Sequence, residues 1–139
     1  MKNSKLVVAI TFAVFVLLTT AFGQTGAIKV SVPFNFSVGK QSMAAGDYRV
    51  TIVSPELLQV ARVDGPGVAN MTINYTGGDP NQDQTPRLVF HRYGTRLFLS
   101  EAWIGEVNMG YAFDSTAEVE YARSMHQQPT VVMARLNSK

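Results

Sequence analysis

The stretch Ile28-Lys-Val-Ser-Val-Pro-Phe-Asn-Phe-Ser-Val38 (IKVSVPFNFSV) decides the fold class of this chain. Apolar side chains occupy every second position and alternate with Lys, Ser, Pro and Asn. A period of two places these apolar side chains on one face of a strand, whereas a helix would spread them around its circumference. Pro33 lacks an N–H and so indicates an edge strand or a bulge. We therefore expect an antiparallel strand with one buried face.

Further segments with strand-like patterns follow, and turn-forming residues separate them. They are residues 47–54, 57–63, 68–75, 87–93, 96–104 and 130–136. Beyond Gly105 the pattern changes, because Ser115-Thr-Ala-Glu118 is a capping box that predicts a helix over about 116–125. The sequence thus predicts an all-β fold, an antiparallel sandwich or small open barrel of about seven strands with one short C-terminal helix.

The segment 87–104 reads as a hairpin that is apolar on both faces. Gly94 and Thr95 suit a two-residue loop, which would place His91 opposite Phe98. One predicted face carries Leu88, Phe90, Leu97, Leu99, Glu101 and Trp103, and the other carries Val89, His91, Phe98, Ala102 and Ile104. A strand that is wet on one side does not have this pattern. Either the later helix or a partner should therefore cover the second face.

Residues 1–23 have the three parts of a secretory signal peptide. Lys2 and Lys5 flank a polar start, residues 6–18 are apolar apart from Thr11, and the small residues Ala21 and Gly23 predict cleavage after Gly23. An uncleaved membrane anchor is the alternative, although this run is shorter than the roughly 20 residues that cross a bilayer. We expect a secreted or periplasmic protein with a single β-rich domain over 24–139, and no stable membrane span after cleavage.

Cysteine content and charge exclude several classes of function. The chain has no Cys, which rules out disulfides, thiolate metal sites and a cysteine nucleophile. The formal charge of +2 comes from two lysines in the signal segment, so the mature chain has ten basic and ten acidic residues. A neutral chain gives no electrostatic reason to expect a nucleic-acid partner.

Several motifs resemble a family of small secreted β-rich proteins of Gram-negative bacteria whose function is uncharacterised. The matching residues are Val32–Phe36 (VPFNF), Ala45–Tyr48 (AGDY), Phe90–Gly94 (FHRYG), Phe98–Ser100 (FLS), Trp103 and Ser115–Glu118 (STAE). The chain departs from the family pattern at Asp114, Val119 and Tyr121, where family members often carry Lys or Arg in or near the helix. The resemblance implies a β-rich fold and a secreted location, and it carries no catalytic residues.

The polar residues form no recognisable catalytic or metal-binding motif. Asp79, Asn81 and Asp83 imitate the start of a calcium loop, but Gln84 and Phe90 stand where that loop needs Gly and Glu, so we interpret them as an exposed loop that could contact a partner. The two histidines lack the spacing of a metal site. His91 is therefore interpreted as a packing or hydrogen-bonding residue. A second histidine, His126, suits the negative end of the helix dipole.

Three functions stay open at the level of sequence. The first is a non-catalytic module that binds an envelope protein or a second copy of itself through the outer face of the hairpin, at Val89, His91, Phe98 and Ile104. The second is a small carrier of an apolar molecule held between sheet and helix. The third is an enzyme that uses Glu101 and His91, which the expected register would place on opposite faces of the sheet. We expect the first, with no catalytic residues, no cofactor and no metal.

Overall fold

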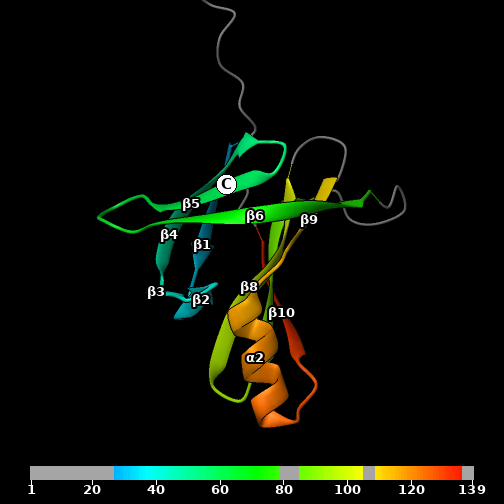
Figure 1. The fold of residues 1–139 in the computed structure, drawn as a ribbon. Coiled ribbons are helices and arrows are strands. Elements are labelled where there is room, and N and C mark those ends of the chain that lie inside the picture. The colour runs from blue at the N-terminus through cyan, green and yellow to red at the C-terminus, as the bar shows by residue number, and fades with distance from the viewer. Residues whose placement is uncertain (1–26, 79–84, 105–108, 136–139) are drawn as a thin grey trace, which may run out of the picture.

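The computed structural model describes residues 27–78, 85–104 and 109–135. Within these ranges the chain forms a single sheet and one helix, α2 (Thr116–Met125) (Figure 1). The ten strands are β1 (Ala27–Val32), β2 (Phe36–Val38), β3 (Gln41–Met43), β4 (Gly46–Ser54), β5 (Leu57–Arg62), β6 (Val68–Gly77), β7 (Arg87–Tyr93), β8 (Arg96–Ile104), β9 (Met109–Phe113) and β10 (Thr130–Arg135). The predicted all-β fold with one short helix is therefore confirmed.

The described strands outnumber the expected seven for local reasons. Pro33 splits the predicted first strand into β1 and β2, and two short strands, β3 and β9, carry no clear alternating pattern. The strands follow one another in the order β1-β4-β5-β6-β9-β8-β2-β3, and β7 pairs with both β8 and β10. Within the described residues β10 approaches β1 without pairing with it, so the sheet stays open and does not close into a barrel.

Almost all neighbouring strands are antiparallel, and one long strand joins two parts of the sheet. The first half of β6 pairs with β5 and its second half with β9 (Figure 1). The exception to the antiparallel pattern is β2, which runs parallel to β8 where Ser37 lies opposite Phe98. This contact brings the N-terminal segment against the hairpin β7–β8.

The apolar face of residues 28–38 packs into the core despite the break at Pro33. Its members are buried or partly buried in one cluster, which contains Ile28, Val30, Val32, Phe34, Phe36 and Val38. The ring of Phe36 meets those of Tyr48 and Phe90 edge-on, with centroid distances of 5.2 and 5.3 Å. Burial of each large side chain stabilises the fold by about 1.5–3 kcal/mol, so this stretch is a main source of stability.

The hairpin β7–β8 follows the expected register only as far as Ser100. Phe90 faces Leu99 as predicted, but Val89 then faces Glu101, which leaves Ser100 as the extra residue of a β-bulge. A shift of one residue exchanges the two faces of a strand. The face predicted for each β8 residue after the bulge is therefore wrong. Ala102 and Ile104 belong to the core, not to the face of Val89 and Phe98; Glu101 and Trp103 lie on that outer face.

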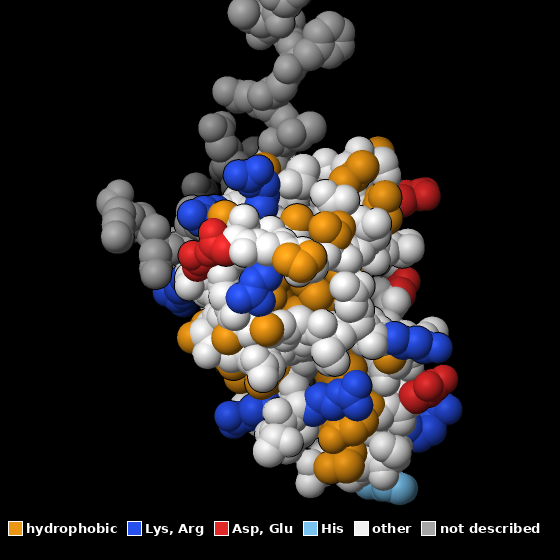
Figure 2. Space-filling model, turned by 90° about the vertical axis from the view of Figure 1, so that its left-hand side faces the viewer, with side chains coloured by type: hydrophobic (Ala, Val, Ile, Leu, Met, Phe, Trp, Pro, Cys, Tyr) orange, Lys and Arg blue, Asp and Glu red, His pale blue; other side chains and the backbone are white. Residues whose placement is uncertain are grey.

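The surface shows no concentration of one type of charge on the face seen in Figure 2, where Lys and Arg side chains lie dispersed among hydrophobic and polar ones. Among the described residues, no helix combines the length and the apolar character that a membrane crossing requires.

Candidate functional site

Helix α2 lies against the outer face of the hairpin β7–β8. The helix occupies the predicted range, and the Ser115 hydroxyl caps it by accepting a hydrogen bond of 3.1 Å from the Glu118 N–H. The ring of Tyr121 packs on Phe98 and Tyr93, with centroid distances of 5.6 and 6.1 Å. The helix is therefore the layer that covers the second apolar face of the hairpin.

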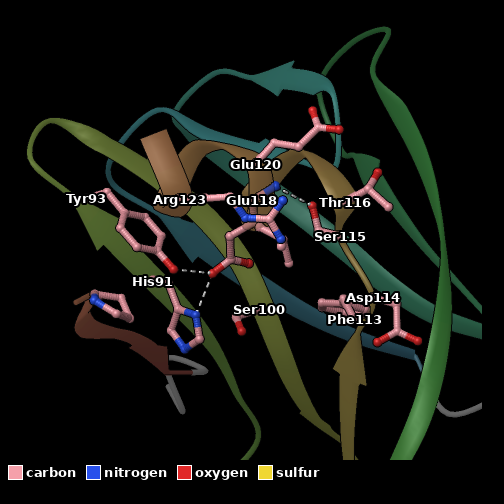
Figure 3. A pocket seen from close by; sticks show the side chains of 12 residues that line it. His91, Tyr93, Ser100, Phe113, Asp114, Ser115, Thr116, Glu118, Glu120 and Arg123 are labelled. Carbon is pink, nitrogen blue, oxygen red and sulfur yellow. Dashed lines mark hydrogen bonds and ion pairs between the residues drawn. The ribbon is translucent and has the colours of Figure 1, made fainter. Parts of the chain in front are cut away.

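The most buried residue of the helix is a carboxylate. Glu118 is 8% exposed, and its Oε1 atom accepts a hydrogen bond of 3.0 Å from the Tyr93 hydroxyl and lies 2.6 Å from Nδ1 of His91 (Figure 3). In a complete capping box this carboxylate would turn back to the N–H of Ser115. Here it points down onto β7 instead, so only half of the predicted box forms, and the helix is fastened to the strand by polar contacts.

The Tyr93 hydroxyl is held in its neutral form by its surroundings. Burial, the hydrogen bond to Glu118 and the negative charge of that carboxylate together raise the pKa of Tyr93 from 10.0 to about 12. Each of these factors disfavours a phenolate. Tyr93 therefore serves as a permanent hydrogen-bond donor near neutral pH.

A cleft of about 560 Å³ opens beside this cluster, between the start of α2 and the sheet. Its lining residues are His91, Tyr93, Ser100, Phe113, Asp114, Ser115, Thr116, Glu118, Val119, Glu120, Arg123 and Pro129. A second cleft of about 520 Å³ shares Tyr93, Arg123 and Pro129 with the first and continues toward the end of the helix. Ligand sites in proteins have volumes of roughly 300–1,000 Å³. The first cleft is of this size and also contains His91, Tyr93 and Glu118, so it is the candidate functional site.

The residues predicted to form an interaction surface do not make an exposed patch. Val89, Phe98 and Ile104 are 5%, 1% and 3% exposed, whereas the His91 side chain keeps 27% of its surface accessible. Phe98 lies under the helix, and the bulge turns Ile104 into the core. Of the four, the structure brings only His91 to the cleft.

The structure also places the remaining candidate residues. The expectation that His91 and Glu101 face opposite sides is wrong, because the bulge puts both on the outer face. They still form no pair: the Glu101 carboxylate accepts a hydrogen bond of 3.0 Å from the Trp103 indole, and His91 contacts Glu118. The predicted loop contacts Asp79, Asn81 and Asp83, like the signal segment 1–23, lie outside the described residues. In the described part of the chain, no three His, Asp or Glu side chains converge as metal ligands.

Sequence reasoning missed Glu118 as the partner of His91 and Ser100 as a lining residue. One signal was available: Glu118 lies three and four positions before Tyr121 and Ala122, a spacing that places the three side chains on one face of a helix. A carboxylate on a face that packs against the sheet needs a buried partner. No local pattern indicated the bulge at Ser100.

Comparisons with protein-family models, curated proteins and solved structures gave no significant match to this chain.

Proposed function

We propose that this chain is a non-catalytic secreted or periplasmic module that binds a partner in the cell envelope through the cleft beside α2. The observation that carries the proposal is the cleft itself, a concave site of about 560 Å³ with polar side chains on its floor and walls. Concave sites with a few placed polar groups are where proteins bind ligands and protruding side chains of partners. A cleft is a better candidate than the outer hairpin face, since α2 covers much of that face.

A catalytic role has less support from the geometry. The carboxylate–histidine pair resembles the orienting half of a hydrolytic triad, but the Ser100 hydroxyl makes no hydrogen bond to His91, which such a nucleophile needs. An apolar carrier is also less supported, because three carboxylates and one guanidinium line the cleft between sheet and helix, and an apolar ligand would offer these charged groups no partner.

The proposal is tested by site-specific photocrosslinking in the cells that export the protein. A photoreactive phenylalanine replaces Val119, which lines the cleft and is 55% exposed, or Val53, which is 54% exposed and lies on β4 away from the cleft. We expect one recurrent adduct of defined mass from position 119, repeated from Glu120 at the rim, and none from position 53. Equal adducts at 119 and 53, or none at 119, would contradict the proposal.

The location is tested separately on the exported protein. Mass spectrometry of the protein recovered from the periplasm or the medium should give a chain that begins at Gln24, as cleavage after Gly23 requires. A full-length chain in the membrane fraction would support the anchor instead.

A further inference from the structure

The floor of the cleft holds a hydroxyl with no hydrogen-bond partner in the described part of the chain. Ser100 is 8% exposed and lines the cleft, and its side-chain oxygen is accessible from the cleft rather than enclosed in the core. It is the extra residue of the β-bulge, and bulges next to functional sites re-aim a side chain out of the regular alternation. The fold leaves both the donor and the acceptor capacity of this hydroxyl unused, so it is available to a ligand that enters the cleft.

Ser100 shares the cleft with a second group that has unused hydrogen-bonding capacity. Both contacts of the Glu118 carboxylate are made by Oε1, while the second oxygen points to the other side, toward the cleft (Figure 3). A carboxylate has lone pairs on both oxygens, so this second oxygen can still accept. The Ser100 hydroxyl lies below the same carboxylate in the same cleft (Figure 3).

The remaining polar groups of the cleft are mostly acceptors. When Nδ1–H of His91 donates to Glu118, the other ring nitrogen of a neutral imidazole is an acceptor. Asp114 and Glu120 add two carboxylates to the lining, against one guanidinium, that of Arg123. A site rich in acceptors with more carboxylates than cations fits a group that donates several hydrogen bonds and carries positive charge.

The geometry points to Ser100 and Glu118 as a binding site for a primary ammonium group, carried either by a lysine side chain of the partner or by a small free amine. An ammonium has three donors and no acceptor, which suits one carboxylate oxygen and one hydroxyl oxygen on the floor. A metal ion would need a convergent set of ligands that the described residues do not form. This inference rests on the proposed function, because it names the group that the cleft receives.

The test is a titration of the isotope-labelled protein followed by the backbone amide signals of Ser100 and Glu118. The probes are Nα-acetyl-lysine amide, its uncharged analogue Nα-acetyl-norleucine amide, and n-butylamine. We expect saturable shifts with the lysine probe and none with the norleucine probe. Binding of the lysine probe alone indicates a partner's side chain, and equal binding of n-butylamine indicates a free amine. No saturable shift with either amine, or equal shifts with norleucine, overturns the inference.

Variants separate direct binding from effects on the fold. Ser100→Ala should weaken binding about tenfold, as expected for one lost hydrogen bond to a charged group, and Ser42→Ala, at an exposed serine that lines a different cleft, should not. Glu118→Gln keeps an acceptor but removes the charge, and should also weaken binding. Arg123→Ala should tighten it by removing a like charge, which a structural role would not cause. Unchanged affinity in both Ser100→Ala and Glu118→Gln overturns the inference.

The two proposals can fail independently. If the amines do not bind but the adduct at Val119 persists, the ligand class is wrong and the cleft remains a partner site. If the amines bind and Val119 gives no adduct, the ammonium site stands while the partner-binding role fails.

Discussion

The contact of Glu118 with His91 and Tyr93 makes a quantitative prediction about stability. Glu118→Ala removes the acceptor of two hydrogen bonds that reach one carboxylate oxygen over 3.0 Å and 2.6 Å. Hydrogen bonds to charged groups contribute about 1.5–3 kcal/mol each, and breaking a buried pair costs about 3–5 kcal/mol. The His91 side chain is 27% exposed, so water replaces part of its contact. We expect a loss of about 3 kcal/mol in the free energy of unfolding.

Urea denaturation followed by circular dichroism measures this loss. Glu120→Ala is the matched control, because it makes the same chemical change two residues away at an exposed position of the same helix. We expect the control to change the free energy of unfolding by less than about 0.5 kcal/mol. A double-mutant cycle with Tyr93→Phe should give a coupling energy of about 1 kcal/mol.

The refuting result is a small effect at both positions. If Glu118→Ala costs no more than Glu120→Ala, the carboxylate does not fasten the helix to the strand. The apolar contacts of Tyr121 with Phe98 and Tyr93 would then be sufficient to hold α2.

Two further predictions concern a phenol and a glycine. Burial and a hydrogen-bonded carboxylate raise the pKa of Tyr93 to about 12 in the folded state. The contribution of this residue to the free energy of unfolding is therefore complete below the unfolded pKa of 10.0, and it is lost as the pH rises from 10.0 toward 12. Urea midpoints measured across this range should fall less steeply in Tyr93→Phe than in the parent, and parallel curves would refute the shift. Gly110→Ala should cost about 1–3 kcal/mol, because an added Cβ would lie 2.6 Å from the Thr76 hydroxyl oxygen and 2.8 Å from the Trp103 ring. The indole fluorescence of Gly110→Ala should also change. In Gly65→Ala the added Cβ would have its nearest neighbour at 3.8 Å, so this variant should match the parent in both stability and fluorescence.

The sequence predicts the fold well where local chemistry acts alone. The period of two in 28–38 identifies a buried face even though Pro33 breaks the strand, because both pieces keep their inward side chains. The bounds of α2 are those predicted, since the Ser115 cap depends on residues only three positions apart. The short strands β3 and β9 were missed, because their strand conformation depends on pairing with β2 and with β6 and β8 rather than on their own patterns.

The candidate site could not be predicted in the same way, because one bulge decides it. The hairpin register is set by the turn at Gly94–Thr95 and holds for four residue pairs, from Tyr93–Arg96 to Phe90–Leu99. Beyond them, strict alternation would bring Ala102 and Ile104 to the outer face and Trp103 into the core. The bulge at Ser100 instead buries the aliphatic side chains and leaves the indole on the outer face, where its N–H reaches the Glu101 carboxylate.

A competition between local and tertiary hydrogen-bond partners explains why the complete capping box does not form. The Glu118 carboxylate can return to the N–H of Ser115, a neutral donor at the start of the helix, or reach two donors on β7. Once the helix covers Phe98, the hydroxyl of Tyr93 and the ring nitrogen of His91 lie beneath it, and leaving them without an acceptor would cost about 1–3 kcal/mol each. At Glu118 the contacts with His91 and Tyr93 on β7 therefore outweigh the local contact with the N–H of Ser115. The capping box correctly predicts where the helix starts, while the partners of its carboxylate are determined by the strand that the helix covers.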